Sequence, residues 1–257
     1  MLLVFDIGNT NMVIGLYKGK KLVDHWRIAT DRQRTIDEYG LLLDQLFRYH
    51  QLDFHNIKQG IISSVVPNLT PGITQMMEKY LGIKPLIVGA GIKTGMVIRY
   101  ENPKDVGADR IVNAVAGIEK YGKPLVLVDF GTATTFCGIN DKGEYIGGAI
   151  APGIGISANA LIEKTAQLPK VALTIPEKAI GRNTVNAIQS GLLYGYCGLV
   201  DGLVKRFVSE LGHSLGEVAV VATGGLAEVI AKESETINHV DQFLTLDGLR
   251  ILYEKNQ

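Results

Sequence analysis

The fold is decided by a stretch near the N-terminus, Leu2-Leu3-Val4-Phe5-Asp6-Ile7-Gly8-Asn9-Thr10-Asn11. An apolar run precedes a single carboxylate, as in a buried strand that ends in a polar side chain. Gly8 has no Cβ, so it allows a tight turn and a close approach of the backbone to a ligand. The apolar pattern resumes over residues 12–17. The stretch therefore predicts a strand–turn–strand hairpin, without the glycine spacing of the P-loop or of the dinucleotide-binding fold.

The turn of this hairpin has the chemistry of an anion-binding loop. Asn9, Thr10 and Asn11 offer hydroxyl, amide and backbone N–H donors. The carboxylate of Asp6 would repel a phosphate group directly, so we expect it to hold a cation that bridges the two. A plain β-hairpin that happens to contain Asp-x-Gly is the alternative, and this stretch alone leaves it open.

The same stretch occurs a second time, as Leu125-Val126-Leu127-Val128-Asp129-Phe130-Gly131-Thr132-Ala133-Thr134. Asp6 and Gly8 correspond to Asp129 and Gly131 at one offset, 129 − 6 = 123. A Lys-Gly turn and a further strand follow both copies. A repeat of about half the chain length predicts two similar domains in tandem. Two such hairpins facing each other across a cleft would hold the phosphates of a nucleotide and their metal ion from both sides.

The composition is that of a globular protein. The chain has 257 residues, 46% hydrophobic and 20% charged, which suffices for two cores. Lys plus Arg and Asp plus Glu both total 26, so the neutral charge gives no support for nucleic-acid binding. No apolar run is long enough to span a membrane, and we expect a cytoplasmic protein without a signal peptide. Cys137 and Cys197 lack metal-ligand spacing and are expected to be buried thiols.

Periodicity along the chain predicts an α/β protein. The predicted strands cover residues 2–6, 12–17, 21–29, 58–64, 86–88, 125–129, 133–139, 144–150 and 217–222. The predicted helices cover residues 35–50, 67–80, 106–120, 156–166, 184–211 and 246–254. The helix over 184–211 has small and apolar residues at helical spacing, which we expect on its inner side and packed closely against another helix, across a dimer interface: Ala187, Gly191, Tyr194, Gly195, Gly198, Leu199 and Leu203.

A third site is predicted at Gly107-Ala108-Asp109-Arg110, at the start of a helix. The first-turn N–H groups and the helix dipole favour an anion there, and Arg110 can pair with a carboxylate. Asp109 can accept the proton of a hydroxyl group that attacks phosphorus. A local role is the alternative, in which Asp109 caps the helix and pairs with Arg110. The turn at Thr223-Gly224-Gly225-Leu226 suits the flat face of an adenine base, or it is a plain helix entry.

Four elements together resemble the type III pantothenate kinase family of the actin, Hsp70 and sugar-kinase superfamily. They occur in the family's order and at its spacing over essentially the whole chain: Asp6 to Thr10, Asn102-Pro103 with Gly107 to Arg110, Asp129 to Thr134, and Gly147 to Gly153. The resemblance implies two tandem ribonuclease H-like domains of the actin and Hsp70 type, with a nucleotide cleft between them. We expect these domains at residues 1–115 and 116–257.

The resemblance implies ATP-dependent phosphorylation of pantothenate, the first step of coenzyme A synthesis, by a homodimer. It implies that Asp109 is the general base and that Asp6 helps to place Mg²⁺. It also implies that Asp129 is a ligand of a monovalent cation (K⁺ or ammonium) and that Thr132 contacts the nucleotide. The implied phosphate loop is Asp6, Ile7, Gly8, Asn9, Thr10, Asn11, Met12 and Val13. The implied pantothenate contacts are Tyr100, Gly107, Ala108, Asp109, Arg110 and Thr184, the last of them reaching the site from the neighbouring subunit. From the residues alone, Tyr100 could instead be a core aromatic and Thr184 a helix N-cap.

Two other functions stay open at the level of the sequence. One is a kinase for a different hydroxyl substrate, such as a sugar or hexosamine. The other is a nucleotide-binding regulatory protein, in which ATP only closes the cleft. The neutral charge and the lack of a DNA-binding motif argue against direct contact with DNA.

Overall fold

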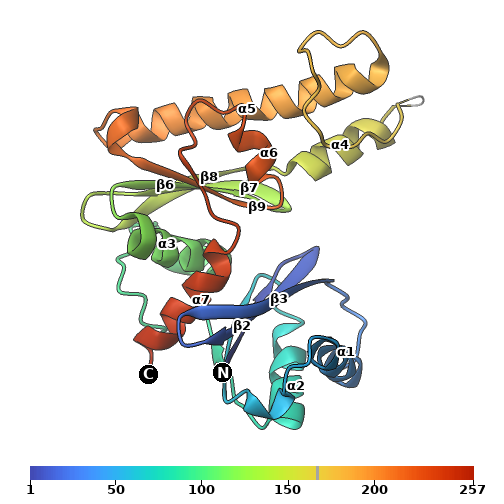
Figure 1. The fold of residues 1–257 in the computed structure, drawn as a ribbon. Coiled ribbons are helices and arrows are strands. Elements are labelled where there is room, and N and C mark those ends of the chain that lie inside the picture. Colours follow the sequence, from blue (N-terminus) through green and yellow to red (C-terminus); the bar gives the residue numbers. More distant parts are fainter. Residues whose placement is uncertain (166–167) are drawn as a thin grey trace. The chain divides into compact units, whose positions relative to one another are not determined.

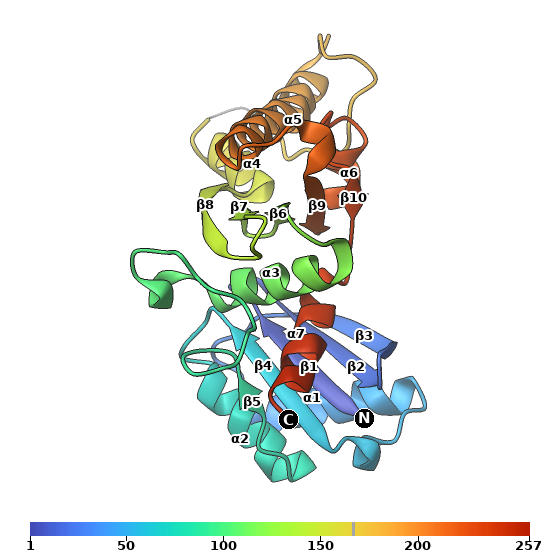
Figure 2. The ribbon, with the colours of Figure 1, turned by 90° about the vertical axis from the view of Figure 1, so that its left-hand side faces the viewer.

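A computed structural model describes residues 1–165 and 168–257, which pack into two compact units. Unit 1 contains Met1–Gly95, Asn102–Ala116 and Thr245–Gln257, and unit 2 contains Met96–Glu101 and Gly117–Leu244. Each unit is built on a five-stranded mixed sheet with helices packed on it (Figures 1 and 2). The predicted α/β class is therefore confirmed, whereas the assignment of folding domains to residues 1–115 and 116–257 stays a prediction.

The sheet of unit 1 has the strand order β3-β2-β1-β4-β5. Its strands are β1 (Leu2–Ile7), β2 (Asn11–Lys18), β3 (Lys21–Ala29), β4 (Gln59–Ser64) and β5 (Leu86–Ile87). The central strand β1 is antiparallel to β2 and parallel to β4. This pairing places Ser63 of β4 and Val13 of β2 opposite Asp6 of β1. The predicted first hairpin is thus confirmed, with Asp6 near the end of the central strand.

Two helices cover one face of this sheet. The first, α1 (Ile36–Tyr49), begins at a capping box in which the Thr35 N–H donates to Glu38 Oε2 at 2.7 Å. The second, α2 (Thr70–Leu81), begins three residues later than predicted, because residues 67–69 form a turn and Pro71 suits the first helical turn. The core under these helices receives Leu3, Phe5 and Ile7 of β1 together with apolar residues of both helices.

The opposite face of the same sheet is covered by α7 (Figure 2), and the unit 1 part of α3 lies against α7. The bounds are Ala108–Tyr121 for α3 and Leu244–Lys255 for α7. A Cβ on Gly15 of β2 would lie 3.1 Å from Leu246 Cδ1, and Tyr17 Oη donates to Asp247 Oδ1 at 2.9 Å. Gly248 of α7 lies against the backbone of Val112 of α3, which leaves no room for a larger residue. The C-terminal helix therefore completes unit 1.

The sheet of unit 2 repeats the arrangement of the first. Its strands are β6 (Leu125–Phe130), β7 (Ala133–Ile139), β8 (Tyr145–Pro152), β9 (Ala219–Gly224) and β10 (His239–Val240), in the order β10-β9-β6-β7-β8. The central strand β6 is antiparallel to β7 and parallel to β9, as β1 is to β2 and β4. The predicted repeat is confirmed. The sequence did not predict β10, because two residues carry no periodic signal.

Three helices lie on one face of this second sheet: α4 (Ile154–Glu163), α5 (Thr184–Glu210) and α6 (Ala227–Ala231) (Figure 1). The predicted start of α4 at 156 is two residues late, and its predicted end at 166 lies outside the described residues. The N-cap of α5 is Asn183, whose Oδ1 accepts from the Asn186 N–H at 2.8 Å. The N-cap alternative for Thr184 is therefore wrong, since Thr184 is the first helical residue.

The predicted inner side of α5 is also wrong. The core of unit 2 receives Ile188, Leu192, Tyr196, Val200 and Val204, because these side chains gain far more hydrophobic free energy on burial than glycine does. Of the predicted set, Tyr194, Leu199 and Leu203 are half-buried, and the remaining four residues are exposed. Apart from the adjacent residues and the nearby backbone of α5 itself, no described atom lies within 4 Å of the position that a Cβ would take on Gly191, Gly195, Gly198 or Gly202.

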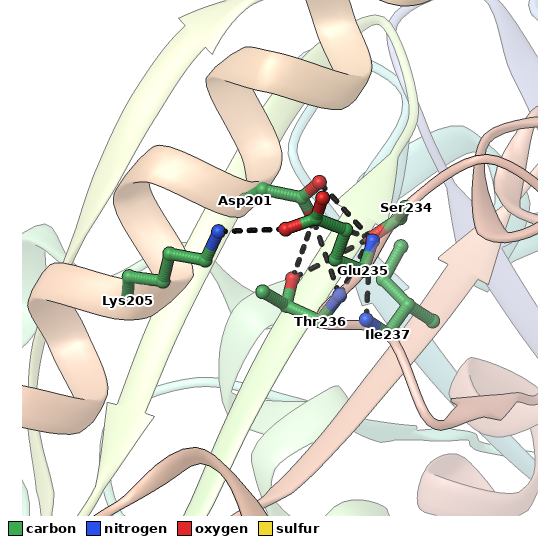
Figure 3. Close-up of polar contacts among 6 residues, drawn as sticks. All are labelled: Asp201, Lys205, Ser234, Glu235, Thr236 and Ile237. Carbon is green, nitrogen blue, oxygen red and sulfur yellow. Dashed lines mark hydrogen bonds and ion pairs between the residues drawn. The ribbon is translucent and has the colours of Figure 1, made fainter.

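The segment between α6 and β10 is attached to α5 by a buried carboxylate (Figure 3). Asp201 of α5 accepts hydrogen bonds from Ser234 Oγ at 2.6 Å, from Thr236 Oγ1 at 2.8 Å and from the Glu235 N–H at 3.1 Å. Lys205, one turn along α5, forms an ion pair with Glu235 at 2.9 Å. Burial alone raises the pKa of Asp201, but these hydrogen bonds outweigh it and leave the pKa below its usual value.

The two cysteines are buried, as predicted, and burial raises the pKa of the Cys197 thiol to about 11. Such a thiol is unreactive at neutral pH. Within residues 1–165 and 168–257, no helix is long and apolar enough to cross a membrane.

Candidate active site

The first hairpin turns at Gly8, where β1 ends. The Gly8 N–H donates to the carbonyl oxygen of Asn11 at 3.0 Å, and a Cβ on Gly8 would lie 2.9 Å from that oxygen. Asn9 and Thr10 are exposed at the tip, and Asp6 is half-buried just before it. The side chains of Ile7 and Met12 are fully buried, so these residues can offer a ligand only their backbone groups. The loop therefore presents N–H, amide and hydroxyl groups beside one carboxylate.

A buried hydroxyl group accompanies Asp6. Because Leu3, Phe5 and Ile7 point toward α1 and α2, Asp6 points to the other face of the sheet, and its in-register neighbour Ser63 shares that face. Ser63 is fully buried, and its Oγ has no hydrogen-bond partner among the described residues. A buried hydroxyl without a partner is costly, so it marks a position where a water molecule or ligand completes the site. No motif in the sequence marks Ser63 as a site residue.

The start of α3 lies at the same end of the sheet. The Val65 N–H donates to the carbonyl oxygen of Ile7 at 3.0 Å, so Val65 follows β4 directly beside the end of β1. A Cβ on Gly107 would lie 3.9 Å from Val65 Cγ1 and 2.5 Å from Asp109 Oδ1. Unit 1 therefore brings the start of α3, with Asp109, to the end of the sheet where β1 and β4 stop.

Asp109 is half-buried in the first turn of α3, and Arg110 beside it is buried. Asp109 Oδ1 accepts from the Arg110 N–H at 2.8 Å, a contact that agrees with the local-cap alternative. Burial raises the pKa of Asp109 above its usual value, although this hydrogen bond and the charge of Arg110 oppose the rise. A raised pKa is common for carboxylates that exchange protons with a substrate, and helix capping does not account for it.

The second hairpin, in unit 2, has a similar turn. The Gly131 N–H donates to the Ala133 carbonyl oxygen at 3.1 Å, and Thr132 is exposed at the tip. Asp129 is half-buried near the end of β6, and its in-register neighbours are two hydroxyl residues, Thr135 of β7 and Thr223 of β9. These residues offer the oxygen atoms that hard cations prefer.

Two glycines of unit 2 shape this second hairpin. Gly224 has a φ of +93°, and a Cβ there would lie 2.7 Å from Asp129 Oδ1, so both the backbone conformation and the space require glycine. Gly153 lies directly against the carbonyl oxygen of Thr132. Tyr196 of α5 holds the residue before Gly153, because its Oη donates to the Pro152 carbonyl oxygen at 2.7 Å. The role predicted for the Gly224-Gly225 turn at an adenine base stays a prediction.

The remaining predicted substrate contacts, Tyr100 and Thr184, also belong to unit 2. Tyr100 is half-buried, with its ring centroid 6.4 Å from that of Tyr145, so it is not a core aromatic. Thr184 is exposed and lines a groove of about 710 Å³ at the start of α5, together with Arg182. The predicted pantothenate contacts are thus divided, since residues 107–110 belong to unit 1.

In the part of the chain that the structure describes, no three His, Cys, Asp or Glu side chains gather as a metal site requires. Mg²⁺ is commonly held by one or two carboxylates together with substrate phosphates, and Asp6 is one carboxylate beside the N–H and hydroxyl groups of the first hairpin.

Comparison with known proteins decides the family. The model of the family "type III pantothenate kinase" matches residues 2–206. The chain belongs to the type III pantothenate kinase family. A type III pantothenate kinase of an Exiguobacterium species is 54% identical over 257 residues, all of both chains. Another from Bacillus cytotoxicus is 56% identical over 256 residues, all of this chain and 97% of the relative.

Solved structures agree on the fold. A conserved protein of Campylobacter jejuni, provisionally described as a Baf family transcriptional activator, is 18% identical with a TM-score of 0.64 and covers 99% of this chain and 98% of its own. The ethanolamine utilization protein EutJ of Carboxydothermus hydrogenoformans is 12% identical with a TM-score of 0.56 and covers 98% of this chain and 89% of its own. At these identities the likeness concerns the fold alone.

As a member of the type III pantothenate kinase family, the protein is an ATP-dependent pantothenate kinase, and its reaction is the first step of coenzyme A biosynthesis. The family does not by itself assign roles to the residues described above. Sequence reasoning also missed Thr30, whose Oγ1 donates to the Gly8 carbonyl oxygen at 2.7 Å. No local pattern marks Thr30, because it follows β3 and reaches the loop only in the folded chain.

Proposed function

We propose that Asp109 is the general base of this kinase and takes the proton of the primary hydroxyl group of pantothenate. The observation that supports this role most directly is the position of the Asp109 carboxylate, half-buried at the end of the sheet where Asp6 and the Gly8 turn lie, and burial there raises its pKa. A carboxylate shielded from water binds a proton more readily than an exposed one, and a general base has to bind the proton that it accepts.

In the proposed step, the hydroxyl oxygen of pantothenate attacks the terminal phosphorus of ATP. A new O–P bond forms, the bond between that phosphorus and the bridging oxygen breaks, and its electron pair leaves with ADP. The proton of the hydroxyl group passes to the carboxylate of Asp109. The loop from Asp6 to Val13 binds the phosphate groups through its backbone N–H groups and the side chains of Asn9 and Thr10, and Thr132 contacts the nucleotide. These donors stabilise negative charge in the transition state.

Asp6 is the residue that would hold Mg²⁺. The buried Ser63 hydroxyl, without a described partner and in register with Asp6, fits a water molecule of the ion's hydration shell. Asp129 would hold the monovalent cation, K⁺ or ammonium, since Thr135 and Thr223 flank it and Gly224 lies against its Oδ1. Bound cations neutralise charge that develops on the phosphate oxygens.

Pantothenate carries a carboxylate and a primary hydroxyl group, and the start of α3 offers a counterpart for each. Arg110 and the first-turn N–H groups suit the carboxylate, and Asp109 suits the hydroxyl group. We assign Gly107 and Ala108 to the same subsite, and Tyr100 and Thr184 to further contacts with the substrate.

We propose that two chains pair through α5. Glycine costs about 1 kcal/mol relative to alanine inside a helix, so four glycines on one open face need a compensating contact. A second helix packed against Gly191, Gly195, Gly198 and Gly202 would supply one, because the absence of Cβ atoms allows close approach of the two backbones. The family resemblance, in which Thr184 serves the neighbouring subunit, agrees with this pairing.

A comparison of substrates tests the proposal that the start of α3 binds pantothenate. The purified protein is given ATP, Mg²⁺ and K⁺ with either pantothenate or N-acetylhexosamines, and ADP release is followed by a coupled assay. We expect ADP release with pantothenate, with a product heavier by one phosphate group, and only background with the sugars. Turnover of a sugar at a similar rate, or none with pantothenate, would overturn the assignment. Neither alternative function is favoured by a specific feature of the structure.

A further inference from the structure

A cationic side chain lies against the first hairpin, although no Lys or Arg occurs between Asp6 and Val13. Arg32 follows β3, and its Nη2 donates to the side-chain oxygen of Asn9 at 3.1 Å. Its side chain is exposed, so a ligand at the loop can reach it. Folding therefore brings a guanidinium group to a loop whose own sequence supplies none.

Hydrogen bonds hold the chain on both sides of Arg32. Before it, the Thr30 N–H donates to the Thr10 carbonyl oxygen at 3.0 Å, and Thr30 Oγ1 donates to the Gly8 carbonyl oxygen at 2.7 Å. At Asp31, Tyr39 Oη donates to the carbonyl oxygen at 2.7 Å. After it, the Gln33 N–H donates to Asp31 Oδ1 at 2.9 Å. The segment that carries Arg32 is thus attached both to the loop and to α1.

A triphosphate bound at the residue 6–13 loop would need a positively charged group nearby. A triphosphate carries several negative charges, and the carboxylate of Asp6 adds another beside it. A guanidinium group has five N–H donors in a planar fork that matches phosphate oxygens, and one hydrogen bond to Asn9 leaves donors for a ligand. We propose that Arg32 is a phosphate-binding residue of the ATP site. This inference rests on the proposed role of the residue 6–13 loop in phosphate binding.

The chain supplies a matched control in the same segment. Arg34 has the same charge, but its guanidinium lies over the ring of Tyr39, 5.4 Å from the centroid. Replacing either arginine by glutamine removes one positive charge from the residue 30–35 segment. Only Arg32 is held against the hairpin, so only Arg32→Gln should affect a ligand bound there.

The test is isothermal titration calorimetry of the full-length protein and the variants Arg32→Gln, Arg32→Lys and Arg34→Gln with ATP and with adenosine, in the presence of Mg²⁺. We expect Arg32→Gln to weaken ATP binding by about 10- to 100-fold, the range for loss of one charge-assisted hydrogen bond. The affinity of Arg32→Gln for adenosine should stay unchanged. The ATP affinity of Arg32→Lys should lie between those of the wild type and Arg32→Gln, and Arg34→Gln should bind ATP like the wild type. Circular dichroism melts check that each variant is folded.

Equal ATP affinity of Arg32→Gln and Arg34→Gln would overturn the inference. An equal loss of ATP and adenosine binding in Arg32→Gln would also overturn it, because a purely structural role does not depend on phosphate. If the wild type phosphorylates pantothenate while Arg32→Gln binds ATP normally, only this inference fails. If the wild type binds no ATP, the inference and the proposed function fail together.

Discussion

Replacing Asp109 by Asn should nearly abolish turnover and at the same time stabilise the folded protein. Asn is similar in size and keeps an oxygen that can accept from the Arg110 N–H, now 2.8 Å from Asp109 Oδ1. The change therefore removes the negative charge and the proton-accepting group and little else. Loss of a general base lowers rates by about 10²- to 10⁴-fold, which corresponds to about 3–5 kcal/mol of transition-state stabilisation.

The stability effect follows from the sign of the pKa change. Burial raises the pKa of Asp109 in the folded state, so the charged form is less favourable there than in the unfolded chain. That unfavourable contribution is absent below the unfolded-state pKa and appears as the pH rises through the folded-state pKa. Asp109→Asn should therefore have a higher Tm than the wild type near pH 8, and the two melting temperatures should converge near pH 4.

Three measurements check this prediction. Coupled ADP release gives kcat, titration calorimetry gives the ATP affinity, and thermal melts at several pH values give Tm. We expect kcat to fall by the factor above, the ATP affinity to stay within about twofold, and the acidic limb of the wild-type kcat/KM profile to lie above the usual pKa of an aspartate. Unchanged kcat would remove Asp109 from catalysis, and a lower Tm of the variant near pH 8 would refute the argument from burial.

Four further predictions concern other parts of the molecule. Ser63→Ala should weaken the binding of Mg·ATP but not of adenosine, as measured by calorimetry. If the variant and the wild type bind Mg·ATP equally well, the Ser63 hydroxyl group has no role at the cation. Gly224→Ala should lower the free energy of unfolding by about 1–3 kcal/mol in urea titrations, because alanine is strained at this positive φ; no loss would contradict the packing against Asp129. Gly195→Leu should give a monomer by light scattering without loss of helix, and a persistent dimer would place the interface elsewhere. Asp201→Asn should lower the free energy of unfolding by about 2 kcal/mol near pH 7. This difference from the wild type should disappear as the pH falls through the lowered folded-state pKa of Asp201, because the hydrogen-bonded carboxylate stabilises the fold only when it is charged. A difference that does not change with pH would contradict this.

The repeat allowed the fold to be predicted from the sequence. Asp6-x-Gly8 and Asp129-x-Gly131 each end a buried run, and the two sheets indeed share one strand order around them. The start of α1 was also predictable, because the capping box of Thr35 and Glu38 is a local signal. Local patterns of this kind can be predicted from the sequence, because they depend only on residues that are neighbours in the chain.

The sequence failed where distant segments compete for the same space. The glycines of α5 were expected on its inner side, but Ile188, Leu192 and Val200 occupy the core and turn the glycines outward. The packing of these glycines against another helix stays a prediction. Ser63 and Arg32 could not be found from the sequence, because only strand pairing and the β3–α1 connection bring them to the hairpin. The raised pKa of Asp109 likewise depends on burial by the folded chain and not on its neighbours in the sequence.

The most direct test of the account is the fate of the terminal phosphate of ATP, followed by phosphorus NMR in a mixture of wild-type protein, ATP, Mg²⁺, K⁺ and pantothenate. We expect the terminal phosphate signal to be replaced, one for one, by a phosphomonoester signal on pantothenate, with no accumulation of inorganic phosphate. Release of inorganic phosphate without a phosphorylated product would mean that the hairpins bind and hydrolyse ATP without serving Asp109, and the proposed chemistry would be wrong.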